Sequence, residues 1–156
     1  MVNQLLLACM VLTPPTSGLE HPTILAMQKE SVRQRKAYGL KPQKLDKECC
    51  EIAQNWADYM AKTNSFYHGG GEQIIAVGYG TPEAAFRGWM ASSGHRYWVL
   101  SRTEKCGWGA AQSESGRWYW VGAFRSSDRV INASTPEVPP PVRYVPRRKF
   151  RLFKRR

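Results

Sequence analysis

The sequence lacks a hydrophobic run long enough to cross a membrane. Its longest apolar run, from Leu5 to Leu12, has eight residues, whereas a membrane-spanning helix needs about 20. A chain of 156 residues can bury one hydrophobic core but is short for two domains of ordinary size. Hydrophobic residues make up 42% of it and there are six tryptophans, which excludes a wholly disordered chain. We therefore expect one folded domain and no transmembrane segment.

Several motifs that would identify an enzyme or a metal site are also absent. No two cysteines have Cys-x-x-Cys spacing, which argues against zinc-ribbon and thioredoxin-like sites. No Gly-Lys pair occurs, so the sequence has no phosphate-binding P-loop. No serine lies in a Gly-x-Ser-x-Gly elbow, which excludes the lipase interpretation of His68-Gly69-Gly70-Gly71.

The cysteines leave the disulfide question open. Cys49 and Cys50 are adjacent, and on a helix their side chains would point about 100° apart. At most one of them is therefore expected to reach a distant partner such as Cys106. We favour burial of one as a small apolar residue.

Acidic residues are missing from the C-terminal end. The last fourteen residues contain eight of the 23 basic residues and no acid, and the remainder has 15 basic and 12 acidic residues. Five prolines between Pro136 and Pro146 exclude a regular helix or central strand there. We predict a Pro-rich linker and basic tail over residues 131–156, able to bind an anionic polymer or membrane surface without specific nucleic acid recognition.

Residues 1–20 resemble a secretory leader. An apolar stretch is followed by Thr13-Pro14-Pro15, but no Lys or Arg precedes Leu5, so we expect either a signal that is incomplete at its N-terminal end or a stretch that is not a signal. Leu6-Leu7-Ala8-Cys9 also resembles a bacterial lipobox, which leaves lipidation as an alternative. We expect a secreted or cell-envelope location.

Hydrophobic spacing predicts helices in the first two thirds of the chain. One is expected over His21–Tyr38, ended by Gly39, and a short turn over His95–Leu100. Asp46 and Thr81 are suitable N-caps for two further helices. The helix after Asp46 has one apolar stripe, formed by Cys49, Ile52, Ala53, Trp56, Ala57 and Met60.

The pattern then changes to alternation with a period of two. Cys106–Gln112 and Gly116–Arg125 are predicted to form a β-hairpin. Both faces of its second strand are apolar: Trp118, Trp120 and Phe124 alternate with Tyr119, Val121 and Ala123. We therefore expect helices on both sides of the sheet.

Two histidine segments are the candidate functional sites. His68 and Glu72 bracket three glycines, which permit an unusual backbone path. His95 lies in Ser92-Ser93-Gly94-His95-Arg96. Taken alone, either histidine is more often a hydrogen-bonded structural residue than a functional one.

The order of short segments along residues 22–127 resembles the CAP superfamily of cysteine-rich secretory, antigen five and pathogenesis-related proteins, most of all its short bacterial members. The segments are Gly39-Leu40-Lys41-Pro42, Leu45-Asp46, Ala53 to Ala61, His68, Gly71-Glu72-Gln73-Ile74, Trp89 to Arg96, Cys106-Gly107-Trp108-Gly109 and Trp118-Tyr119-Trp120-Val121. The resemblance implies an α+β fold over residues 21–130, a three-layer α-β-α sandwich with a small antiparallel sheet between helices. It also implies secretion.

The resemblance further implies a cleft with two histidines and two acids. Carried over residue by residue, it gives His68, Glu72 and His95, while the second acid would fall near Ser92 and is missing. Gln73 stands where the family usually has asparagine. Two imidazoles, His68 and His95, could hold zinc or another divalent metal weakly, or form a hydrogen-bonded cluster with no metal or other cofactor.

We therefore predict a secreted, non-catalytic CAP-like domain whose cleft binds a small ligand or a divalent metal. Two alternatives stay open. One is a metal-dependent hydrolase that uses the same cleft with Glu72 as base. The other is an adaptor that binds anionic surfaces through the basic tail.

Overall fold

The structure, a computed structural model, describes residues 18–126. Most of the leader predicted over residues 1–20 and all of the tail predicted over 131–156 lie outside the described residues. The elements run in the order α1 (Pro22–Ala37), β1 (Lys44–Leu45), α2 (Lys47–Thr63), β2 (Gln73–Val77), α3 (Pro82–Ala91), α4 (Ser93–Val99), β3 (Lys105–Gln112) and β4 (Trp118–Arg125). All of the predicted helices are present within two residues of their expected starts.

The sheet has the strand order β1-β3-β4-β2. Strands β3 and β4 form the predicted antiparallel hairpin, and β2 pairs antiparallel with β4 on its other side. The two-residue β1 pairs parallel with β3, so the sheet is mixed at one edge rather than wholly antiparallel. Neither β1 nor β2 is predicted from the sequence pattern.

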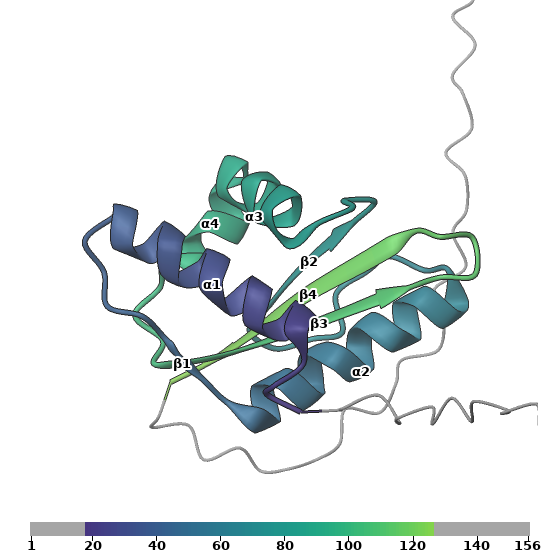
Figure 1. Cartoon of the computed structure of the whole chain (residues 1–156), viewed down its shortest axis with the longest axis horizontal. Helices are drawn as coiled ribbons and strands as arrows, with labels where there is room; N and C mark the ends of the chain where they lie inside the picture. Colours follow the sequence, from purple (N-terminus) through teal and green to yellow (C-terminus); the bar gives the residue numbers. More distant parts are fainter. Residues whose placement is uncertain (1–17, 127–156) are drawn as a thin grey trace, which may run out of the picture.

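The two apolar faces of the hairpin are covered as expected. Helices α1, α3 and α4 lie on one side of the sheet and α2 lies on the other (Figure 1). Trp120 and Phe124 pack under the first group of helices, while Tyr119 and Val121 pack against α2. The molecule is therefore the three-layer α-β-α sandwich that the sequence predicts.

Helix α2 packs on β3 through small residues. Asp46 caps its first turn by accepting a hydrogen bond from the Cys49 amide at 3.1 Å. A Cβ atom added at Gly107 or Gly109 of β3 would collide with the backbone of α2. Glycine at these two positions is thus what lets the helix lie directly on the strand. The predicted apolar stripe of this helix is wrong at one position, because Ile52 is 41% exposed.

The three cysteines among residues 18–126 are free thiols buried on both sides of the sheet. Cys49 packs between α2 and the sheet, whereas Cys50 and Cys106 belong to the core on the opposite face. Burial raises the pKa of Cys49 to about 12, with a further contribution from the Asp46 carboxylate. Burial also raises the pKa values of Cys50 and Cys106. These thiols are neutral at physiological pH, so they act as core residues and not as thiolate nucleophiles.

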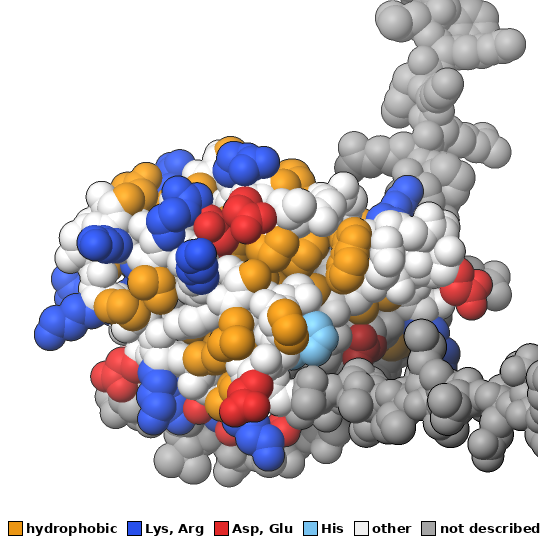
Figure 2. All heavy atoms as spheres, in the orientation of Figure 1, with side chains coloured by type: hydrophobic (Ala, Val, Ile, Leu, Met, Phe, Trp, Pro, Cys, Tyr) orange, Lys and Arg blue, Asp and Glu red, His pale blue; other side chains and the backbone are white. Residues whose placement is uncertain are grey.

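Figure 2 shows the charge on one face of the described domain. Lys and Arg side chains gather over α3 and the C-terminal half of α1, while apolar side chains form a strip over the sheet beside them. Within the described residues, no helix is both long enough and apolar enough to span a bilayer.

Candidate functional site

The loop that carries His68 is fixed on both sides of the histidine. The Trp56 indole on α2 donates a hydrogen bond to the Tyr67 carbonyl at 2.9 Å, and the Gly69 amide donates to Oε1 of Gln73 at 3.0 Å. Gly69 also lies against the Trp56 ring, where a Cβ would come within 2.6 Å of the indole. His68 therefore occupies a defined position although its own side chain is exposed.

The glycines that follow make the path of this loop possible. Gly70 and Gly71 have φ values of 102° and 74°, which residues with a side chain rarely adopt. The chain then reaches Glu72, whose carbonyl accepts a hydrogen bond from the Phe124 amide at 2.9 Å. The loop is thus tied to β4 immediately before β2 begins.

His95 is held by the junction between α3 and α4. Ser92 has an extended conformation, with φ −96° and ψ 125°, and both ends α3 and begins α4. The Arg96 guanidinium donates to the Met90 carbonyl at 3.0 Å and links the two helices. The sequence resemblance would place the family's second acid near Ser92, and here that position forms the helix junction.

The structure brings His68 and His95 together. Their ring centroids are 6.4 Å apart and their planes are inclined by 35°. Burial, and secondly the nearby His68, lowers the pKa of His95. A lowered pKa keeps this imidazole neutral at pH 7, so one of its ring nitrogens remains available as an acceptor or metal ligand.

Glu72 does not complete a metal site with the histidines. No group of three His, Cys, Asp or Glu side chains in residues 18–126 is arranged to hold a metal ion. The donor set is therefore two imidazoles, which does not fit the three protein ligands typical of a catalytic zinc centre. A two-nitrogen set still permits a weakly held metal with open coordination positions.

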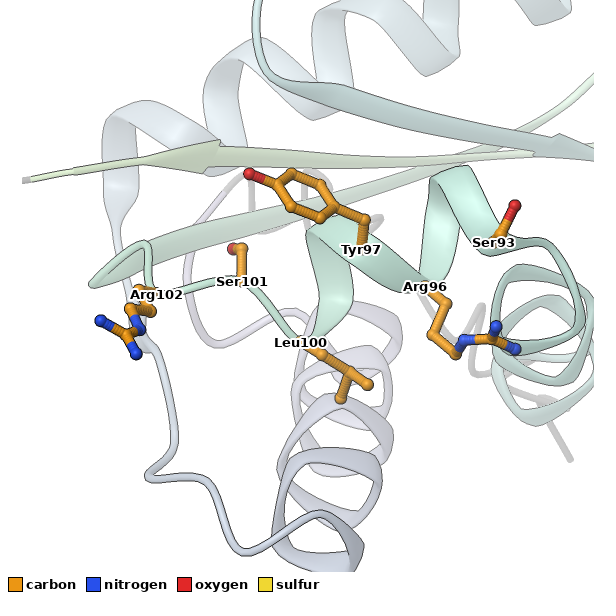
Figure 3. A pocket seen from close by; sticks show the side chains of 6 residues that line it. All are labelled: Ser93, Arg96, Tyr97, Leu100, Ser101 and Arg102. Carbon is orange, nitrogen blue, oxygen red and sulfur yellow. The ribbon is translucent and has the colours of Figure 1, made fainter.

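A separate pocket of about 470 Å³ lies beside α4 (Figure 3). Its lining residues come from α4 and the loop that follows: Ser93, Arg96, Tyr97, Leu100, Ser101 and Arg102. Ser93, Arg96, Tyr97 and Leu100 follow i, i+3, i+4, i+7 spacing and share one side of α4, whereas His95 lies on the opposite side. The pocket is thus distinct from the histidine pair, and the sequence pattern does not predict it.

The pocket could not be recognised from one element alone. Among the lining residues only Arg96 and Arg102 are charged, and they are six positions apart in the sequence. Their proximity to one cavity depends on the turn after α4, which the helical pattern does not specify. Tyr97 is 66% exposed at this site.

A three-layer α-β-α sandwich with one histidine on the loop before β2 and another on α4 defines a CAP-type domain. The profile of the CAP family, described as the cysteine-rich secretory protein family, matches residues 32–124. This match covers more than half of the chain, and the protein belongs to that family. The resemblance inferred from the ordered segments is confirmed.

Solved structures of other CAP proteins have the same fold. An outer surface protein from Borrelia burgdorferi superimposes with a TM-score of 0.59 at 17% identity, over 64% of this chain and 89% of its own. An extracellular protein with an SCP domain from Bacillus anthracis gives 0.55 at 20% identity, over 67% and 40% of the two chains. A venom allergen-like protein from Schistosoma mansoni gives 0.53 at 18% identity, over 69% and 92%.

These similarities establish the fold and nothing more specific. All three identities are at or below 20%, and proteins of one fold can differ in function. No curated protein matches the sequence significantly.

Proposed function

We propose that the protein is an exported, non-catalytic CAP domain that binds a small ligand or a divalent transition metal between His68 and His95. The observation that carries the proposal is the 6.4 Å separation of the two imidazoles. They come from segments 27 positions apart, and separate backbone contacts hold each segment in place.

The chemistry of the pair favours a ligand that accepts nitrogen donors. Neutral imidazole nitrogens suit zinc-like metals, whereas calcium and magnesium prefer oxygen ligands. In a tetrahedral zinc site with Zn–N distances of ~2.1 Å, the ring centroids would lie about 5 Å apart. The rings would thus have to approach by roughly 1 Å, which the exposed His68 side chain can provide by changing its rotamer. Two protein ligands give only modest affinity.

The groups around the pair support the proposal of a non-catalytic role. The buried cysteines are neutral thiols, and the described residues supply no third metal ligand. The competing proposal of a metal-dependent hydrolase requires Glu72 to act as a base on metal-bound water. It is distinguished by peptide and glycan cleavage assays with zinc present, in which a loss of activity in Glu72→Gln would favour the hydrolase.

The binding proposal is tested by calorimetric titration of zinc into the full chain at pH 7. Replacing His68 or His95 by alanine is expected to abolish the binding heat. The matched control is His21→Asn, because His21 caps α1 through its side chain at 3.3 Å from the Thr23 amide and asparagine can also cap a helix. We expect this control to bind zinc normally.

Protonation supplies a second readout of the same site. Binding should weaken as the pH falls, because a protonated imidazole cannot coordinate a metal. Absence of heat with zinc at neutral pH, tighter binding of calcium, or equal loss in His21→Asn would contradict the proposal of a zinc-type site.

Export is the third part of the proposal. It rests on the signal-like composition of residues 1–20 and on membership of a family described by its secretory members. A mass spectrum of the mature protein would report the N-terminus, and any lipid on Cys9, directly. A mature protein that retains residues 1–20 in the cytoplasmic fraction would contradict export.

A further inference from the structure

We propose that the pocket beside α4 binds a phosphate-type oxyanion carried by a small organic group, with Arg96 and Arg102 as its anion-binding residues. The pocket lies on the side of α4 opposite to His95. The proposal is therefore independent of the histidine site and of what that site binds.

The charge of the pocket favours an anion. Its six lining residues include two arginines and no acid, and the guanidiniums lie at opposite ends of the row of side chains in Figure 3. Among the described residues, neither arginine forms an ion pair, whereas Arg33 and Arg125 are paired with Glu30 and Glu48. Guanidinium groups bind tetrahedral oxyanions through charge-assisted hydrogen bonds.

Arg96 is fixed in place for this role. One of its guanidinium nitrogens donates to the Met90 carbonyl at 3.0 Å. The remaining N–H groups are available to a ligand, and the side-chain entropy of ordering the arginine has already been lost on folding. A pre-ordered guanidinium binds an anion with a smaller entropic cost than a mobile one.

A third positive charge lies directly behind the pocket. Arg35 is only 5% exposed, and its guanidinium donates to the carbonyls of Lys41 at 2.8 Å, Val99 at 2.8 Å and Ser101 at 2.9 Å. Within the described residues it has no carboxylate partner. A buried charge that is paired only with carbonyl dipoles is poorly neutralised, so an anion in the adjacent pocket would be stabilised by it.

A chain of hydrogen bonds can supply a hydroxyl donor as well. The Gln43 amide donates to the Thr103 hydroxyl at 2.6 Å, and that hydroxyl lies 2.6 Å from the Ser101 hydroxyl. Gln43 and Thr103 are both buried. When the Thr103 hydroxyl donates to the Ser101 oxygen, the Ser101 hydroxyl can donate its own proton to a ligand in the pocket. An oxyanion accepts such a hydrogen bond.

The size and the other walls of the pocket indicate an attached organic group. A volume of about 470 Å³ falls within the range of small-molecule sites, and is more than a bare phosphate fills. Leu100 and the exposed ring of Tyr97 provide an apolar surface beside the arginines. An aromatic or ring-shaped phosphomonoester would use both parts of the pocket.

The test is calorimetric titration of the full chain with phenyl phosphate at low ionic strength. We expect binding that weakens about tenfold or more in Arg102→Gln, because a charge-assisted contact is lost. Arg102 is exposed and forms no hydrogen bond or ion pair within the described domain, so this variant should keep the melting temperature. Ser101→Ala should weaken binding by a smaller factor, and His68→Ala should leave it unchanged.

The matched control is Arg117→Gln, which removes one exposed positive charge from the hairpin turn, away from the pocket. Vesicles of phosphatidylcholine with phosphatidic acid form a second arm that distinguishes a lipid headgroup from a soluble phosphate. A loss specific to Arg102→Gln in either arm supports the pocket and identifies the source. Failure of both probes to bind, or equal losses in Arg102→Gln and Arg117→Gln, would overturn it.

Discussion

The two histidines differ in exposure, and burial affects the titration of His95. His68 is exposed, whereas His95 is partly buried. Burial disfavours the charged form of His95, and the imidazole of His68 adds to the effect. Protonation of His95 is therefore linked to the stability of the fold. Both residues contribute nitrogens to the proposed site.

We predict that protonation of His95 destabilises the folded domain. The pKa is 6.5 for an ordinary histidine and lower for His95 in the folded state. Between these two values the unfolded chain binds more protons, so the free energy of unfolding falls as pH decreases through that window and is unaffected above it. Thermal melting from pH 7.5 to 4.5 should show this loss, and His95→Gln should show less of it.

His68→Gln provides the comparison, since removing the neighbouring charge should reduce the loss without abolishing it. Identical pH profiles for His95→Gln and the original protein would show that His95 is not desolvated in solution.

At the scale of single residues, the sequence singled out His68 and His95 as candidate site residues but not the contacts that hold their segments in place. The ordered resemblance identified His68, Glu72 and His95. Trp56 and Gln73 hold the His68 loop through hydrogen bonds with the Tyr67 carbonyl and the Gly69 amide. No pattern of residue types predicts such contacts. Arg35 was missed for the same reason, since two of its carbonyl acceptors, Val99 and Ser101, lie 64 and 66 positions away in the chain.

At the scale of elements, the helices and the hairpin could be predicted because their signals are local. Asp46 and Thr81 cap their helices as expected, and the alternation in β4 matches its two covered faces. Strand β2 could not be predicted, because its residues are almost all buried and show no alternation. Strand β1 is too short, at two residues, to carry any pattern.

The contact of α2 with β3 leads to a prediction about Gly107. Alanine at this position places its Cβ against the backbone of Cys49 and Cys50. Backbone cannot move aside as a flexible side chain can, so Gly107→Ala should destabilise the domain by ~1–3 kcal/mol or more. Urea unfolding followed by tryptophan fluorescence would measure the change.

Gly80→Ala is the matched control for this substitution, because a Cβ there meets no atom within 4 Å and φ lies outside the left-handed range. We expect its stability to stay within about 0.5 kcal/mol of the original. A similar effect from both substitutions would mean that close packing of α2 on the sheet is not the cause.

At the scale of the whole molecule, the chain combines a nearly balanced body with a strongly basic end. Residues 1–142 contain 15 basic and 12 acidic residues, while the last fourteen residues contain eight basic residues and no acid. The body holds the residues of both proposed sites. The basic end can attract any polyanion through charge alone, which would concentrate the domain at an anionic surface.

We predict that residues 136–156 bind anionic polymers or membranes and are dispensable for the fold. Deleting them should leave the melting temperature of the domain unchanged, because the five prolines between Pro136 and Pro146 disfavour a regular element that could pack on it. Retention on heparin and on anionic vesicles should fall markedly.

Tyr144, Phe150 and Phe153 interleave with the basic residues, and stacking or interfacial insertion would add to the charge attraction. Because attraction through counterion release weakens with salt, retention of the full chain should decrease steeply between 50 and 200 mM NaCl, as expected for about 6–10 phosphate-type contacts. A variant with Tyr144, Phe150 and Phe153 replaced by serine separates the two contributions, since it keeps every charge. A large loss of thermal stability on deletion would show that this segment packs on the domain, and unchanged retention would exclude it as a binding element.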